Sequence, residues 1–205
     1  MIDFYTAGTG NGHRAALALE ESGLPYRAHK LNLAAGDARK PEYLLISPGA
    51  TIPAIVDHDG PGGKPLALAQ SGAILLYVAE KSGKLLPKDP ARKAAALQWF
   101  MYACTDTAVT SGAIFQLANN APEKSPANAA FFEQRLLGFL RVFDGRLAGR
   151  EYLADEFSVA DVALFPVVNQ RKAAVEKAGD MPQLLAWLAR VGARPAIGKG
   201  MQVSI

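Results

Sequence analysis

Two short segments of this 205-residue chain carry groups that could bind a charged, peptide-like molecule. Ile52-Pro53 precedes the apolar run 54–56, and this aliphatic residue before proline at the mouth of a short strand, together with the strand signal at 65–68 and the helix start at 70–71, predicts a cis-proline corner. There the residue before proline offers its backbone N–H and C=O to a ligand. Gln70-Ser71 opens the apolar run 72–81, which predicts a helix whose start has free N–H groups and a hydroxyl. Such a helix start is a binding site for a carboxylate.

The segments around these residues alternate between strand and helix signals, which predicts an α/β domain over residues 1–83. Gly23 stands where the C-terminal cap of the first helix belongs, and the turn formers at 57–64 predict a hairpin. The expected order is strand, helix, strand, helix, strand, strand, helix, at residues 2–6, 12–22, 26–31, 41–45, 52–56, 65–68 and 72–81. This order resembles the thioredoxin-like fold.

The second half of the chain is expected to be helical. Residues 84–90 contain Pro87 and Pro90 and are expected to link the first domain to an all-helical domain at 91–205. Ser158-Val159-Ala160-Asp161 has the form of a capping box with Asp in place of Glu, so a helix is expected to begin there.

As an ordered set, these features resemble the cytosolic glutathione transferases over both domains. The resemblance implies an α/β thioredoxin-like N-terminal domain, an all-α C-terminal domain, glutathione as co-substrate and a homodimer. It also implies that Thr51, Ile52 and Pro53 belong to the glutathione-binding residues, with the backbone of Ile52 pairing with the cysteinyl residue. Gln70 and Ser71 would bind the γ-glutamyl end.

The same resemblance directs attention to the loop before the first helix, where a donor must stabilise the glutathione thiolate. A free thiol has a pKa of about 8.5, and a hydroxyl, an amide or a helix N-terminus aimed at sulfur lowers it. Thr9 and Asn11 are the expected catalytic donors. The alternative roles are a helix cap for Thr9 and a cap or turn residue for Asn11. Tyr5 also competes, although it lies inside the expected strand, where buried tyrosines are common.

The stretch Thr9-Gly10-Asn11-Gly12-His13 looks most like the nu class, bacterial glutathione transferases with disulfide-bond reductase activity. In that class threonine and asparagine face the sulfur, and glutathione supplies every reacting thiol. Thr51 replaces the long polar side chain expected before Ile-Pro. A basic contact to the glycyl carboxylate is therefore either absent or supplied from elsewhere in the chain, with Lys40 and Arg14 as the candidates.

Other residues have two open roles each. Cys104 is either a buried, inert thiol or a cysteine that forms a mixed disulfide with glutathione. Asp106 is either a solvated or capping residue or an acid that reaches the glutathione amine across a dimer interface. Three aromatic residues either line the co-substrate pocket or pack in the core: Trp99, Tyr102 and Phe115.

Composition excludes several classes of protein. The single cysteine rules out an intramolecular disulfide and a dithiol cycle, and it favours a reducing, cytoplasmic location. The N-terminus does not resemble a signal peptide, no run approaches about 20 apolar residues, and we expect no membrane contact. The net charge is only +3, without a basic run bearing aromatics, so no nucleic-acid partner is expected. His29 and His58 are far apart in sequence without companions, so we expect no metal.

The sequence therefore predicts a two-domain homodimeric enzyme that activates the glutathione thiolate, most specifically a glutathione-dependent disulfide-bond reductase. One alternative is conjugation of glutathione to electrophiles, or peroxide reduction, at the same site. A second alternative is a non-catalytic protein that keeps the fold for interactions.

Overall fold

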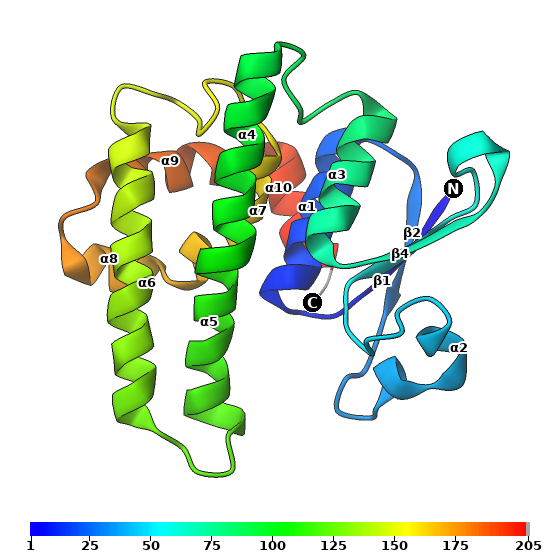
Figure 1. Ribbon diagram of the computed structural model, residues 1–205, viewed down its shortest axis with the longest axis horizontal. Helices are drawn as coiled ribbons and strands as arrows, with labels where there is room; N and C mark the ends of the chain where they lie inside the picture. Colours follow the sequence, from blue (N-terminus) through cyan, green and yellow to red (C-terminus); the bar gives the residue numbers. More distant parts are fainter. Residues whose placement is uncertain (204–205) are drawn as a thin grey trace. The chain divides into compact units, whose positions relative to one another are not determined.

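The computed structural model describes residues 1–203 (Figure 1). Contacts within the chain divide it into two compact units. One contains residues 1–86 together with residues 192–203, and the other is Pro87–Val191.

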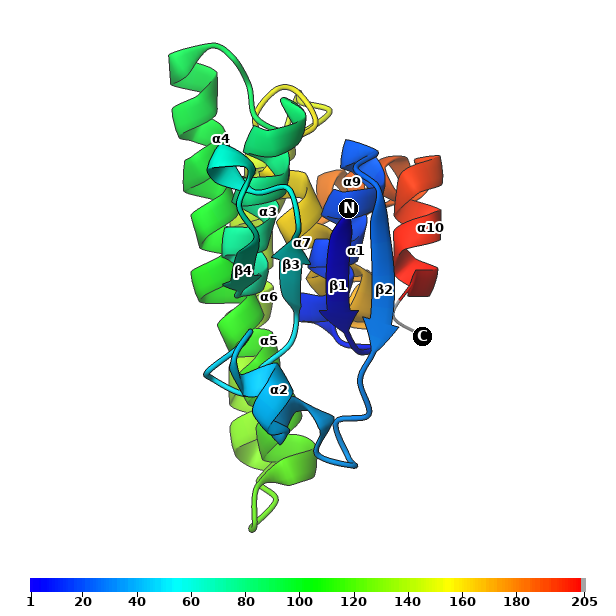
Figure 2. The same ribbon diagram turned by 90° about the vertical axis from the view of Figure 1, so that its right-hand side faces the viewer.

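A four-stranded sheet in the order β2-β1-β3-β4 forms the centre of the first unit (Figure 2). Its strands are β1 (Ile2–Thr6), β2 (Tyr26–Lys30), β3 (Ala54–Asp57) and β4 (Leu66–Ala69). The pair β1–β2 is parallel, whereas β1–β3 and β3–β4 are antiparallel. The predicted thioredoxin-like order and the hairpin are confirmed.

Helices cover the buried face of this sheet, against Ile2, Phe4 and Thr6. The helices of the unit are α1 (Gly10–Ser22), α2 (Pro41–Leu44), α3 (Ser71–Ser82) and α10 (Pro195–Val203), with single 3₁₀ turns at Asp37–Arg39 and Pro61–Gly63. Both α3 and α10 pack against α1. Gly23 ends α1 in the left-handed region at φ 73°, as the sequence predicts.

The C-terminal helix α10 packs in the first unit, although the sequence assigns residues 91–205 to one helical domain. Gly200 lies so close to α1 that a Cβ there would sit 2.8 Å from Leu17 Cδ2 and 3.0 Å from Leu17 Cα. The guanidinium of Arg194 also donates two hydrogen bonds of 2.7 Å to Glu21 on α1. A glycine at the crossing and a bidentate ion pair beside it therefore hold α10 on α1.

The second unit is helical, as predicted (Figure 1). Its elements are α4 (Pro90–Tyr102), a π-helical turn (Ala103–Thr107), α5 (Ala108–Phe115), a second π-helical turn (Gln116–Asn120), α6 (Pro126–Leu147), α7 (Val159–Gln170), α8 (Lys172–Ala178) and α9 (Pro182–Gly192). No helix among residues 1–203 has the length and apolar character needed to cross a membrane.

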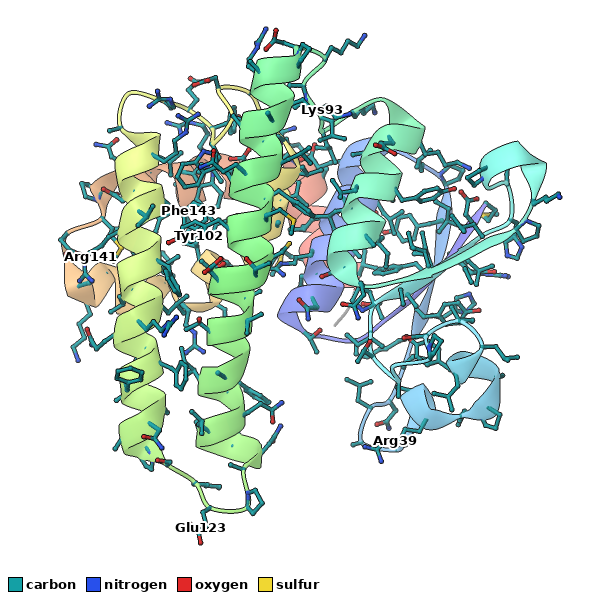
Figure 3. The ribbon with its side chains drawn as sticks, viewed as in Figure 1. Arg39, Lys93, Tyr102, Glu123, Arg141 and Phe143 are labelled. Atoms are coloured by element: carbon teal, nitrogen blue, oxygen red, sulfur yellow. The ribbon has the colours of Figure 1, made fainter. Side chains whose placement is uncertain are left out.

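Aromatic rings fill the space between α4 and α6. Tyr102 stacks on Phe143 with 5.1 Å between ring centroids (Figure 3), and Trp99 lies 5.4 Å from the same ring. Two of the three aromatic residues considered for a co-substrate pocket therefore take part in packing inside the helical unit. Phe115, the third, is 49% exposed.

The start of α7 is a buried network that contains the predicted capping box. Asp161 accepts hydrogen bonds from the backbone N–H of Ser158 at 3.0 Å and from its hydroxyl at 3.2 Å. It also accepts from the Leu153 N–H at 3.2 Å and from Trp187 Nε1 at 2.8 Å. Burial raises the pKa of Asp161 to about 6, although these four donors oppose that shift.

Candidate functional site

The register of the sheet brings three of the predicted binding segments together at one end of its strands. This edge of the sheet is formed by the end of β1, the beginning of β3 and the end of β4. Ala54, the first residue of β3, pairs with Tyr5 on one side and with Ala69 on the other. Because β3 is antiparallel to both neighbours, its beginning lies beside the ends of β1 and β4. The loop after β1, the Ile52-Pro53 corner and Gln70-Ser71 all leave the sheet at this edge.

The Ile52-Pro53 corner has the predicted cis peptide bond. The carbonyl just before it, that of Thr51, accepts hydrogen bonds from the Tyr43 hydroxyl at 2.7 Å and the Ser47 hydroxyl at 2.9 Å. Within residues 1–203, neither the N–H nor the C=O of Ile52 has a hydrogen-bond partner. The corner is thus anchored at Thr51, and it leaves one donor and one acceptor for a strand-like ligand.

The start of α3 is open. Gln70, the residue before the helix, makes no side-chain cap, and the first backbone bond of the helix runs from Ile74 N–H to Gln70 C=O. Ser71 is only 8% exposed, and its hydroxyl has no partner in the described part of the chain. A hydroxyl and uncapped N–H groups at a helix N-terminus form a site for a carboxylate.

Backbone conformations that side chains rarely adopt occur on both sides of this edge. Ala50 has φ 52° and Gln70 has φ 74°. Only two other non-glycine residues in the described chain have positive φ, Leu85 and Asp155. A residue in this region costs of order 1–3 kcal/mol, and such strain persists where the surrounding structure fixes it, often at ligand sites.

Thr9 is the N-cap of α1, which is the structural role that the sequence left open. Its Oγ1 accepts a hydrogen bond of 3.1 Å from the N–H of Gly12. That bond uses one lone pair of the hydroxyl and leaves its proton free to donate. The capping role and a contact to sulfur are therefore compatible.

Asn11 is exposed, and like Thr9 it uses an acceptor atom in a structural bond and keeps a donor. Its Oδ1 accepts a hydrogen bond of 3.3 Å from the guanidinium of Arg14, which is 2% exposed on the same helix. The amide oxygen is thereby occupied, and the NH2 group remains as a donor. The sequence suggests Arg14 as a contact to a carboxylate, and the structure adds its bond to Asn11, which the i, i+3 spacing permits.

The start of α1 is electropositive. Its first turn contains no acidic residue, and the free N–H groups of the helix end carry a partial positive charge. Burial lowers the pKa of His13, so this neighbouring side chain is neutral at pH 7. The loop therefore favours an anion through the helix end and two remaining donors, the Thr9 hydroxyl and the Asn11 NH2 group.

Tyr5 has a packing role in this structure. Its ring stacks on His29 at 4.7 Å, meets Tyr43 edge-on at 5.9 Å, and joins the apolar cluster around Ala38 and Ala54. Burial, followed by the charge of Asp3, raises the pKa of Tyr5. These contacts favour the alternative in which Tyr5 supports the sheet beneath the site.

The remaining candidates lie in other surroundings. Lys40 makes an ion pair of 2.7 Å with Asp37 and is exposed. Cys104 and Asp106 both lie in the π-helical turn of the second unit, and Asp106 accepts a hydrogen bond of 2.7 Å from the neighbouring Thr105 hydroxyl. The roles of Cys104 and Asp106 toward glutathione stay predictions.

The expectation that His29 and His58 have no companions is wrong. His29 Nε2 lies 2.8 Å from Asp3 Oδ1, and His58 Nε2 lies 2.7 Å from Asp3 Oδ2. These bonds, with a further one from Arg27, hold the pKa of Asp3 well below its usual range. Across residues 1–203, no group of three or more His, Cys, Asp or Glu side chains is placed to hold a metal ion. The cluster joins β1, β2 and the end of β3 by hydrogen bonds.

Comparison with known families agrees with this architecture. Residues 11–81 match the model of the glutathione S-transferase N-terminal domain, and residues 108–199 match that of its C-terminal domain. The chain belongs to the glutathione S-transferase family of enzymes.

Two relatives from Escherichia coli (strain K12) are disulfide-bond oxidoreductases. The chain is 38% identical over 203 residues to the disulfide-bond oxidoreductase YfcG, an alignment that covers 98% of this chain and 94% of YfcG. It is 30% identical over 217 residues to the disulfide-bond oxidoreductase YghU, covering 99% of this chain and 75% of YghU.

Solved structures of similar sequence contain glutathione. A glutathione transferase from Pseudomonas putida, with one glutathione disulfide bound per subunit, superposes with a TM-score of 0.91 at 35% identity, covering 98% of this chain and 90% of the other. A second, from Burkholderia graminis with two glutathione molecules per subunit, gives a TM-score of 0.90 at 34% identity, covering 98% and 87%.

Proposed function

We propose that this protein binds glutathione along the open edge of the sheet and uses its thiolate to reduce disulfide bonds. One observation carries the proposal. Three segments that the register brings to this edge present hydrogen-bonding groups without partners in the described chain, at Ile52, at the start of α3 and in the loop Thr9–Asn11.

Each segment matches a different part of glutathione. The N–H and C=O of Ile52 pair with the backbone of the cysteinyl residue, as an added strand would. Ser71 Oγ and the first N–H groups of α3 bind the γ-glutamyl carboxylate, with Gln70 beside them. The Thr9 hydroxyl and the Asn11 NH2 group donate to the sulfur and lower the pKa of its thiol.

The reaction that this site supports is thiol–disulfide exchange. The bound thiolate attacks one sulfur of a disulfide, forms a mixed disulfide with glutathione and releases the other sulfur as a thiolate. A second glutathione thiolate then attacks the glutathione sulfur of the mixed disulfide, which yields glutathione disulfide and frees the second substrate thiol. Relatives solved with glutathione disulfide or with two glutathione molecules per subunit support this scheme. Its consumption of reduced glutathione also fits the predicted cytoplasmic location.

We also propose that the protein acts as a homodimer. Three large apolar side chains are exposed along the chain from α4 to the end of α5: Met101 at 51%, Val109 at 65% and Phe115 at 49%. A second copy of the chain would cover such a surface. Light scattering is expected to give twice the mass of the chain, and substitution of Val109 by Glu is expected to shift the mass toward the monomer. A monomeric wild-type protein would contradict this part of the proposal.

The direct test is reduction of a small dialkyl disulfide by the purified protein with glutathione. We expect turnover that persists in the Cys104→Ala variant, because bound glutathione supplies the reacting thiols. Thr9→Ala combined with Asn11→Ala is expected to raise the pKa of bound glutathione and to slow turnover at neutral pH. Loss of activity in Cys104→Ala would contradict the scheme.

The alternatives give different results in the same assay. Glutathione binding without disulfide turnover, together with activity on an aryl halide or a peroxide, would assign conjugation or peroxide reduction to the site. Absence of glutathione binding at millimolar concentration would indicate the non-catalytic alternative.

A further inference from the structure

We propose that Arg14 is a positioning residue, which fixes the Asn11 side chain so that its NH2 group faces the bound thiol. This inference rests on the proposed function and names a residue on which the reactivity of the thiol depends. Arg14 touches neither sulfur nor substrate in this scheme and acts through Asn11.

The geometry places the two residues together at the beginning of α1. Arg14 follows Asn11 by three positions, so both side chains lie on one side of the helix. The guanidinium donates to Asn11 Oδ1 at 3.3 Å, although Arg14 is 2% exposed and Asn11 is exposed. A buried charge is costly unless it is hydrogen-bonded, which makes this arginine a fixed donor rather than a mobile surface chain.

The chemistry of the two side chains determines the orientation. A carboxamide has an acceptor end and a donor end of almost the same shape, so packing alone does not distinguish them. Arginine has only donors, and the end of Asn11 that faces it must therefore be the oxygen. The NH2 group then points away from Arg14 as a donor. Turned the other way, the amide would present its oxygen to the thiolate and repel it.

The expected size of the effect is modest. Without Arg14, an exposed Asn11 side chain must be ordered when the thiolate forms, and fixing one side chain in advance is worth about 2- to 10-fold in an equilibrium constant. We therefore expect Arg14→Met to raise the pKa of the bound glutathione thiol by about 0.3–1 unit, which is about 2- to 10-fold in its acid dissociation constant.

The first experiment leaves Arg14 intact, because Arg14 has at least one further interaction and its removal could disturb folding. Asn11→Asp preserves the contact to Arg14 and replaces the donor by a second oxygen. We expect the thiol pKa of bound glutathione, measured from the ultraviolet absorbance of the thiolate against pH, to rise more than in Asn11→Ala. An unchanged thiol pKa in Asn11→Asp would overturn the inference.

The second experiment tests whether Arg14 acts through Asn11. Arg14→Met is expected to raise the thiol pKa in the wild-type background and to have no further effect in Asn11→Ala. Arg14→Lys, which keeps a donor, is expected to raise the thiol pKa by less than Arg14→Met does. Lys64→Met is the matched control, because it removes a charge from the exposed β3–β4 connection at the other end of the sheet. An equal shift in both backgrounds would show that Arg14 acts by its charge alone and would overturn the inference.

Calorimetric titration of each variant with glutathione separates this inference from the function on which it rests. If the wild-type protein does not bind glutathione, the proposed function fails and the positioning role fails with it. If glutathione binds with a lowered thiol pKa that Asn11→Asp raises but Arg14→Met leaves unchanged, only the positioning role is wrong.

Discussion

The N-termini of α7 and α3 both have polar side chains and free backbone N–H groups, but within the described residues only those of α7 are hydrogen-bonded. At α7, Ser158 and Asp161 satisfy each other and the surrounding donors, and both residues are fully buried. At α3, Gln70 provides no side-chain cap, and the Ser71 hydroxyl has no partner within residues 1–203. A helix start closed by its own side chains stabilises the fold, whereas one left open is a site for an outside anion.

The start of α1 lies between these two cases. Thr9 caps the helix and Asn11 is bonded to Arg14, yet both bonds use acceptors of the side chains. The donors that remain are the Thr9 hydroxyl and the Asn11 NH2 group, which the proposed function assigns to the thiolate. Structural and functional roles can therefore coexist in one residue when they use different atoms.

The largest predicted effect is at the closed start. Asp161→Ala leaves four donors without their acceptor, including Trp187 Nε1 and the Ser158 N–H, and should lower the free energy of unfolding of the helical unit by about 3–5 kcal/mol. Denaturant unfolding followed by tryptophan fluorescence reports this unit, because Trp99 and Trp187 both lie in it. Asp180→Ala, in an exposed ion pair with Arg141, is the control and should cost at most about 1 kcal/mol. If Asp161→Ala lowers the free energy of unfolding by no more than about 1 kcal/mol, the start of α7 is not closed by this network.

The same carboxyl group should make stability depend on pH. Burial raises the pKa of Asp161 from 3.8 to about 6, so the folded protein holds this proton more tightly than the unfolded chain does. Its contribution is therefore complete below about pH 4 and is lost as the pH rises through about 6. The free energy of unfolding of the wild-type protein relative to Asp161→Asn should fall over this range, by at most about 3 kcal/mol. A difference that stays constant would show that the four hydrogen bonds balance burial, and one that grows with pH would show that they outweigh it.

At the open start, the effect should fall on binding instead of stability. Ser71→Ala is expected to weaken glutathione binding by about 1–3 kcal/mol, since a charged group loses a hydrogen bond in a buried place. Ser82→Ala, at the other end of α3, removes a hydroxyl bonded to the Ala79 carbonyl and should leave affinity unchanged. Isothermal titration with glutathione compares the two variants. Equal affinities would remove Ser71 from the site.

The smallest effect is expected at the intermediate start. An alanine Cβ at Gly12 would lie 2.3 Å from the Ala7 carbonyl oxygen and 2.6 Å from Thr6 Oγ1, so the loop must move. We expect Gly12→Ala to lower the free energy of unfolding by about 1–2 kcal/mol and to raise the thiol pKa of bound glutathione, because Thr9 shifts with the loop. At Gly10 a Cβ would meet nothing within 4 Å, and Gly10→Ala should be tolerated. Identical behaviour of the two variants would argue against a loop held by close packing.

Part of the fold and of the candidate site is predictable from the sequence, because it depends on residues close together in the chain. The capping box at Ser158–Asp161, the left-handed Gly23 and the order of strands follow from residue types at short spacing, and the structure agrees with each. The cis bond at Ile52-Pro53 was predicted from its place among the neighbouring segments.

Features that depend on the register of distant strands could not be predicted. His58 and Asp3 meet although 55 positions separate them, because β3 pairs antiparallel with β1. The orientation of Asn11 toward Arg14 depends on rotamers that the spacing permits but does not determine. Local signals also place α10 with the other helices, because nothing short-range shows that Gly200 fits against α1.

The position of α10 has a consequence for synthesis of the protein. Domains generally fold as units, with the N-terminal one first as the chain leaves the ribosome. Here the first unit includes α10, so α1 gains this neighbour only after the whole helical unit has been synthesised. Until then Leu17 lacks its contact with Gly200 of α10. The sheet unit therefore depends on a segment that is made after the entire helical unit.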